Sequence, residues 1–116
     1  MSEGNVLDKT NRINMLFDFY EPLLTEKQQT FLKYYFHDDF SLGEIAAEFD
    51  ISRQAVYEHI KRAEQMLEAY EDKLQLLRKH KQRLDYLEQL QAMLKYMPEE
   101  RKEETKRMMD GLRNVD

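Results

Sequence analysis

SLGEIAAEFDISRQAVYEHIKRA, residues Ser41–Ala63, contains the most informative local signals in the sequence. Ser41 with Glu44 three positions later is a capping box, which marks the start of one helix. Ser52 is a good N-cap for a second helix, which begins eleven residues further on. A turn of three or four residues then separates the two helices. This order predicts a helix-turn-helix.

The second helix of the motif has an apolar face and a polar face. The inward face carries side chains at spacings of four, three and four, namely Val56, Ile60, Ala63 and Leu67. Arg, Gln and Lys on the opposite face can hydrogen-bond base edges and phosphates from a major-groove helix. We therefore predict a nucleic-acid-binding face that consists of Arg53, Gln54, Tyr57, Glu58, Lys61 and Arg62.

The charge of the motif is also compatible with a role other than nucleic-acid binding. Ser41–Ala63 holds 3 basic and 4 acidic residues, which is a weak electrostatic footprint for a DNA duplex. A helix-turn-helix that serves packing or protein contact fits the same residues.

Two further helices are expected upstream of the motif. An apolar stripe at i, i+3, i+4 and i+7 predicts a helix over residues 10–21, which Pro22 ends. Thr25 and Gln28 form a capping box, which predicts a second helix over residues 26–37.

Downstream of Ser52 there is neither Gly nor Pro until Pro98, so the chain is expected to be helical almost throughout. Apolar residues recur at spacings of three and four in both parts of this region, but the second series is shifted by one residue relative to the first. This shift predicts a bend or turn at about residues 72–82. Pro98 and the acidic pair after it are a good start for a last helix that runs to about Asp110 and frays after Gly111.

The stretch RKHKQR lies between the two registers and forms a secondary basic patch that could clamp an RNA backbone, with Tyr86 near enough to stack on a base. A charge run on a helix is more often simply solvated. The basic residues of the patch are Arg78, Lys79, Lys81 and Arg83.

These elements predict an all-α protein. Residues 1–71 form a helical bundle with the helix-turn-helix at 41–63, and residues 72–116 form a C-terminal helical extension that packs on the bundle or on a second subunit. The extension and the first helix carry more apolar surface than a small bundle readily covers. We therefore expect a homodimer.

The composition excludes several classes of function. With Cys 0, Gly 3 and Pro 2 in 116 residues, there is no thiol chemistry and little material for a phosphate-binding loop. We find no catalytic constellation, metal site or cofactor motif, and expect a non-enzymatic protein. No apolar run approaches the about 20 residues of a membrane span, and no signal peptide is evident, so we expect a cytoplasmic protein.

The net charge is −5, and its distribution along the chain is uneven. Residues 1–50 carry 4 basic and 10 acidic side chains, whereas residues 51–116 carry 14 and 13. A polyanionic partner should therefore prefer the second part of the chain.

The residues of the motif resemble known bacterial sequences. SLGEIAAEFDISRQAV resembles region 4 of sigma factors, the promoter-binding region. More broadly, NRINMLFDFYEPLLTEKQ followed by HDDFSLGEIAAEFDISRQAVYEHIKRAE and a long charged tail is similar to the YlxM family of small bacterial proteins, over residues 9–75.

The YlxM resemblance implies a regulatory role in the signal recognition particle pathway, with the particle's RNA or one of its proteins as a partner. The sigma resemblance implies base contacts at the positions of Arg53, Gln54 and Glu58. In the sigma pattern the position of Glu58 is usually occupied by Gln, and the carboxylate of Glu58 would repel phosphate. Asp50 stands where the sigma pattern usually has a turn Gly. Asp tolerates the left-handed conformation of such a turn better than most residues. A sequence-specific transcriptional regulator and a protein-interaction module remain the alternatives.

Overall fold

The computed structural model describes the backbone of residues 3–115 and the side chains of residues 7–115. Within that range it contains six α-helices and no β-strand, which confirms the predicted all-α class. The helices are α1 (Glu3–Tyr20), α2 (Glu26–Leu32), α3 (Leu42–Phe49), α4 (Arg53–Leu74), α5 (Leu76–Met93) and α6 (Glu99–Arg113). Contacts divide the chain into two compact units, and the boundary along the sequence lies between Gln75 and Leu76.

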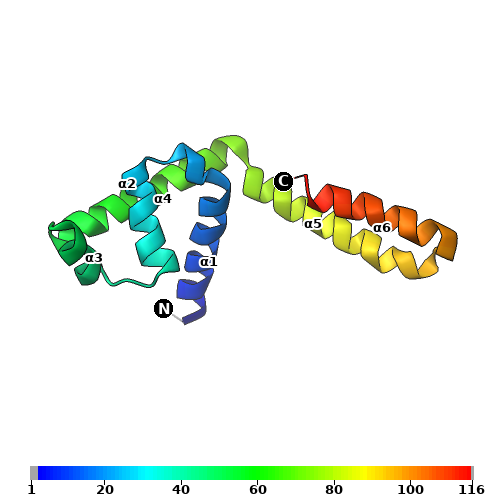
Figure 1. The fold of residues 1–116 in the computed structure, drawn as a ribbon, viewed down its shortest axis with the longest axis horizontal. Helices are drawn as coiled ribbons and strands as arrows, with labels where there is room; N and C mark the ends of the chain where they lie inside the picture. The colour runs from blue at the N-terminus through cyan, green and yellow to red at the C-terminus, as the bar shows by residue number, and fades with distance from the viewer. Residues whose placement is uncertain (1–2, 116) are drawn as a thin grey trace. The chain divides into compact units, whose positions relative to one another are not determined.

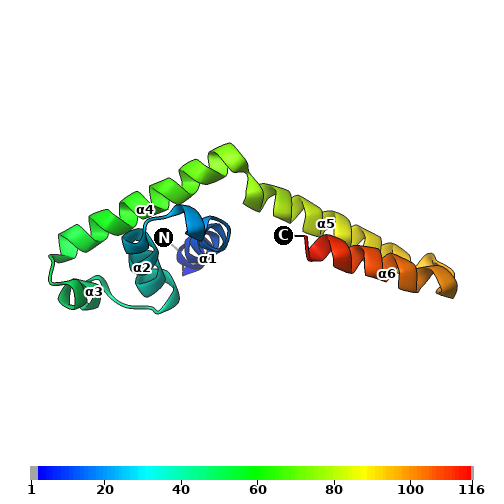
Figure 2. The same ribbon diagram turned by 45° about the horizontal axis from the view of Figure 1, so that its top comes forward.

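In the first unit, α4 packs against α1, α2 and α3 (Figure 1). The inward faces that the sequence predicted for α1 and α4 are confirmed, because every member of both stripes is buried. They consist of Ile13, Leu16, Phe17 and Tyr20 on α1 and of Val56, Ile60, Ala63 and Leu67 on α4. Figure 2 shows α4 as the longest element of this unit, running past the other three helices.

The ends of α1 differ from the sequence prediction at one terminus only. The helix begins at Glu3 rather than near Thr10, and it ends at Tyr20 just before a 3₁₀ turn that contains Pro22. Near the end of α1, the Tyr20 hydroxyl donates a 2.6 Å hydrogen bond to a carboxylate oxygen of Glu71 on α4. Both side chains are buried, so this bond fixes the end of α1 to the end of α4.

The helix predicted for residues 26–37 is an α-helix only in its first part. The capping box of Thr25 and Gln28 is present and opens α2 as expected. After Leu32 the chain continues as a π-helical turn, Lys33–His37, which ends before the acidic pair Asp38 and Asp39. Asp39 there takes the left-handed conformation, with φ 61°. A π turn adds a residue to a helical turn, a feature that apolar spacing does not reveal.

The break in the long C-terminal helical region is confirmed within the predicted range. α4 ends at Leu74, Gln75 adopts the left-handed conformation with φ 55°, and α5 begins at Leu76. The backbone amide of Gln75 donates to the Glu71 carbonyl at 2.9 Å, which closes the last turn of α4. The basic stretch of residues 78–83 lies inside α5 and not in the turn.

The second unit is a hairpin of two antiparallel helices, α5 and α6, which lie side by side in both views (Figures 1 and 2). Its core contains Leu87, Leu94 and Met109, with Met97 packed against them. The predicted start of α6 after Pro98 is confirmed. The predicted fraying after Gly111 is wrong, since the helix runs to Arg113, whose guanidinium binds Asp110 at 2.9 Å.

No helix among the described residues is long and apolar enough to cross a membrane.

Candidate nucleic-acid interface

The helix-turn-helix is built by two capped helices and a short turn. The Ser41 hydroxyl accepts a hydrogen bond from the Glu44 amide at 3.1 Å, and the Ser41 amide donates to the Glu44 carboxylate at 3.0 Å, so the capping box of α3 is complete. The Ser52 hydroxyl accepts from the Ala55 amide at 3.0 Å and caps α4. Both predicted caps are confirmed.

The turn between α3 and α4 consists of residues 50–52, which agrees with the predicted length. Asp50 has φ 53° and ψ 49°, a left-handed conformation that Asp adopts more readily than most residues. The Ile51 amide donates to the Ala46 carbonyl at 3.1 Å. These contacts fix the direction in which α4 leaves α3.

The six residues of the predicted binding face are brought together on the exposed side of α4. Each is exposed, whereas the stripe of α4 that includes Val56 and Ile60 is buried. The face comprises Arg53, Gln54, Tyr57, Glu58, Lys61 and Arg62, over the first three turns of the helix. Figure 1 shows α4 leading out of the turn that follows α3.

Side-chain contacts modify this face at two positions. A Cβ atom on Gly43 would lie 3.4 Å from the Arg53 Nε atom, so the guanidinium of Arg53 lies against the first turn of α3. The Gln54 amide donates a 3.4 Å hydrogen bond to the Glu58 carboxylate. Both side chains therefore have neighbours within the protein, Arg53 at α3 and Gln54 at Glu58, although both residues are exposed.

The next turns of α4 combine an aromatic ring and cations. The Lys61 ammonium lies 5.8 Å from the centre of the Tyr57 ring, within the range of a cation–π contact. The same ammonium is 4.0 Å from the Glu64 carboxylate. Lys61 therefore lies at the border between the binding face and a groove on the neighbouring side of α4.

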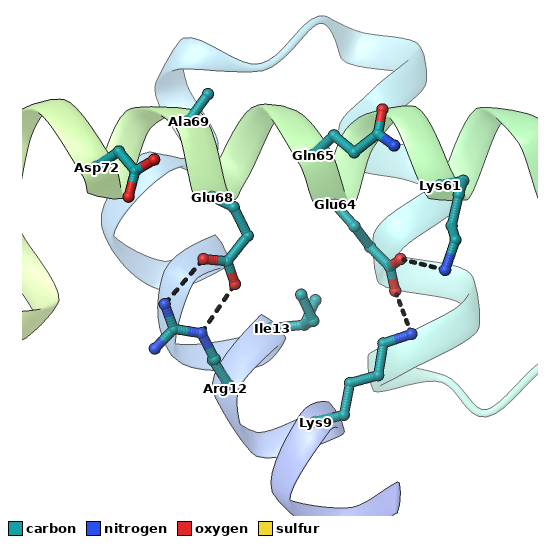
Figure 3. Close-up of a pocket in the computed structure, with 9 residues that line it drawn as sticks. All are labelled: Lys9, Arg12, Ile13, Lys61, Glu64, Gln65, Glu68, Ala69 and Asp72. Carbon is teal, nitrogen blue, oxygen red and sulfur yellow. Dashed lines mark hydrogen bonds and ion pairs between the residues drawn. The ribbon is translucent and has the colours of Figure 1, made fainter.

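That groove runs between α1 and α4 and has a volume of about 470 Å³ (Figure 3). Lys9 on α1 is 3.4 Å from Glu64, and the Arg12 guanidinium donates two hydrogen bonds of 2.8 Å to the two carboxylate oxygens of Glu68. Sequence reasoning missed these two pairs. Lys9 and Arg12 are one turn apart on α1, and Glu64 and Glu68 are one turn apart on α4. Such spacing shows that two residues share a helix face, but it does not show which other helix packs against that face.

Three titratable groups among the described residues of the first unit have shifted pKa values. The hydrogen bonds from Arg12 lower the pKa of Glu68, and the same contact raises the pKa of Arg12. The ring of His59, on α4, stacks on Phe31 with centroids 5.0 Å apart. Burial, with the nearby charges of Lys27 and Arg62, lowers the pKa of His59. His59 thus favours its neutral form beside the binding face.

The predicted secondary basic patch lies on α5, in the second unit. Arg78, Lys79 and Lys81 are exposed, and Arg83 is half-buried. Lys79 and Arg83 stand one helical turn apart and line a hollow of about 340 Å³, together with Gln82 and the Tyr86 ring. The patch therefore spreads over more than one side of the helix.

No group of three or more His, Cys, Asp or Glu side chains suited to a metal ion occurs within the part of the chain that the structure describes.

The capped helices, the short turn and the exposed polar face of α4 define a helix-turn-helix protein. Residues 7–108 match the family UPF0122, described as "Putative helix-turn-helix protein, YlxM / p13 like". The chain belongs to this family, and the resemblance to the YlxM family is confirmed.

Curated relatives match most of the chain. The UPF0122 protein lin1916 of Listeria innocua is 50% identical over 113 residues, which is 96% of this chain and 100% of the relative. The UPF0122 protein BH2485 of Halalkalibacterium halodurans is 64% identical over 85 residues, which is 73% of this chain and 78% of the relative. A Bacillus mycoides relative is 50% identical over 111 residues, with 96% and 100% covered.

Proposed function

We propose that this protein is a non-enzymatic regulator that binds nucleic acid through the exposed face of α4. One observation carries the proposal: the first three turns of α4 expose Arg53, Gln54, Tyr57, Glu58, Lys61 and Arg62 opposite a buried apolar stripe. A helix presented in this way by a helix-turn-helix fits the major groove, with its first turns nearest the bases.

The chemistry of this face favours phosphate contacts over base reading. Lys61 and Arg62 supply cations for phosphates, and the Tyr57 ring offers a flat surface for a sugar or base. Gln54 is bonded to Glu58, whose carboxylate repels phosphate. We therefore place the protein among regulators that recognise a nucleic acid by its backbone and shape.

We propose the signal recognition particle pathway as its setting and the particle's RNA as its ligand. This part of the proposal rests on the resemblance of residues 9–75 to the YlxM family. The cytoplasm is the compartment that such a role requires. We also propose that the protein acts as a homodimer, because its C-terminal hairpin exposes many apolar side chains.

A sequence-specific DNA-binding regulator is the second candidate, and one observation favours it. Arg53 and Gln54 occupy the first turn of α4, from which a recognition helix reaches base edges, and both residue types form paired hydrogen bonds with bases. A rotamer change at these two positions would release them for such contacts.

Fluorescence anisotropy at several salt concentrations tests the proposal, with the particle RNA and a DNA duplex as probes. Arg62→Ala should weaken binding and lower the salt slope by about 0.9 on a DNA duplex, or by about 0.7 on a single strand. Lys73→Ala is the matched control, because Lys73 is an exposed cation in the last turn of the same helix. Equal effects of the two variants would contradict the proposed face.

Two further measurements separate the candidates. Arg53→Ala should weaken binding to all DNA sequences equally if the backbone is recognised, and should relax sequence preference if a base edge is read. In a pull-down from cytoplasm, capture of signal recognition particle proteins that persists after nuclease treatment would point to a protein partner. Binding to neither probe would leave only the protein-interaction role.

A further inference from the structure

The hairpin of α5 and α6 has a very small core of its own. Its buried cluster consists of Leu87, Leu94 and Met109, with Met97 at the edge. Units of about 40 residues seldom bury enough apolar surface to be stable, and they commonly gain the rest by oligomerisation. The hairpin therefore needs apolar cover beyond its own two helices.

A second apolar face runs along one side of the hairpin. On α5 it contains Tyr86, Leu90 and Met93, which follow one another at spacings of four and three, and Tyr86 is 67% exposed. On α6 it continues with Met108 and Leu112, one helical turn apart and likewise exposed. Tyr86, Leu90 and Leu112 line the same hollow of about 340 Å³, which shows that both helices contribute to this one face.

Charge is distributed unevenly along the hairpin. Its open end, residues 76–85 and 106–115, carries seven basic and two acidic side chains. Its closed end, residues 86–105, carries three basic and five acidic side chains. The open end is therefore positive and the closed end negative. The second apolar face extends over both, with Tyr86, Leu90 and Met93 in the closed end and Met108 and Leu112 in the open end.

We propose that the second apolar face of the hairpin pairs with the same face of a second copy of this chain, the open end of one hairpin opposite the closed end of the other. Such a pair forms an antiparallel four-helix bundle with a two-fold axis near Tyr86. It covers the exposed apolar side chains of both copies and brings each positive end to a negative one. The reverse arrangement, open end to open end, would bring seven basic side chains of each copy together.

This inference rests on the proposed homodimer and is independent of nucleic-acid binding. The salt dependence of dimerisation follows from the orientation, because opposite charges attract across the interface. Added salt should therefore weaken the dimer.

Analytical ultracentrifugation of the full chain with paired leucine variants tests the surface. Leu90→Asp, within the face, should raise the dimer dissociation constant at least about a hundredfold, since each dimer loses two buried leucines. Leu84→Asp is the control, because Leu84 is 44% exposed against 36% for Leu90, on the same helix but outside the face. Circular dichroism checks that both variants stay helical.

The possible results separate the surface from the dimer itself. A wild-type chain that stays monomeric at high micromolar concentration would overturn the homodimer and this inference together. A dimer that survives Leu90→Asp would overturn the surface alone. Loss of the dimer in Leu90→Asp but not in Leu84→Asp would support the inference.

Cysteine cross-linking tests the orientation, and the chain has no cysteine to interfere. Lys79 and Met93 stand seven residues on either side of Tyr86. In the proposed bundle, residue 79 of one copy lies near residue 93 of the other. Oxidation of a mixture of Lys79→Cys and Met93→Cys proteins should therefore link the two variants, whereas either variant alone should link weakly. Strong self-linking of Lys79→Cys would overturn the orientation.

Discussion

At the scale of single residues, the proposed binding face depends on the buried side chains on the opposite side of α4. Val56 and Ile60 are buried, and neighbouring Lys61 is exposed, so one step along the helix separates a core position from a surface position. The sequence predicts this division from apolar spacing alone, because a buried face must repeat with the helical period.

Ile60→Ala and Lys61→Ala should therefore differ strongly in their effect on stability. Removal of a buried isoleucine should lower the free energy of unfolding by about 2–5 kcal/mol. Removal of the exposed lysine should cost under about 0.5 kcal/mol, as at an ordinary surface site. Urea titrations measure both values, and equal losses would show that the two helix faces are wrongly assigned.

The ion pairs of the groove between α1 and α4 could not be predicted at this scale. Arg12 and Glu68 are far apart in the chain, and each also looks like an ordinary solvated residue on its own helix. Only the crossing of the two helices brings them to 2.8 Å. Apolar spacing defines which face is buried but not which neighbour covers its edge.

The Arg12–Glu68 pair should make stability depend on pH. Arg12 holds the pKa of Glu68 below its unfolded value, so the pair stabilises the fold above the ordinary carboxyl pKa and loses that effect as pH falls. Arg12→Gln should lower the free energy of unfolding by about 0.2–1 kcal/mol at pH 7, the range for exposed pairs. The difference from wild type should shrink near pH 3 in urea titrations. An unchanged difference there would contradict the assignment.

At the scale of whole elements, the sequence predicts helix starts better than helix ends. The starts at Thr25, Ser41 and Ser52 follow from side chains that accept a hydrogen bond from the first turn. The end of α6 was predicted too early, because a single glycine costs only about 1 kcal/mol within a helix. The π-helical turn after α2 has no signature in apolar spacing at all.

Ser52→Ala should show how much the cap of α4 contributes. Loss of the hydroxyl that accepts from the Ala55 amide should lower the free energy of unfolding by about 0.5–2 kcal/mol. Ser52→Asp retains a capping oxygen and serves as the control, which should stay near wild type. Thermal or urea unfolding measures both variants, and a loss in Ser52→Asp equal to that in Ser52→Ala would contradict a capping role.

At the scale of the whole molecule, the sequence predicts the all-α class and the helix-turn-helix, because caps, spacing and the shortage of Gly and Pro agree over the entire chain. It predicts the region of the break at Gln75 from a one-residue slip in register. The sequence does not predict a ligand for α4 in the same way. Cations, an aromatic ring and a carboxylate on one helix face suit several partners, and the choice depends on contacts outside the chain.

The proposed nucleic-acid interface is formed by the first three turns of α4. An NMR titration of isotope-labelled full-length protein with the particle RNA, and in parallel with a DNA duplex, tests it most directly. The largest backbone shift changes should fall on residues 53–62 and should weaken with added salt. Changes confined to residues 1–40 or to α6, or no changes with either nucleic acid, would contradict it.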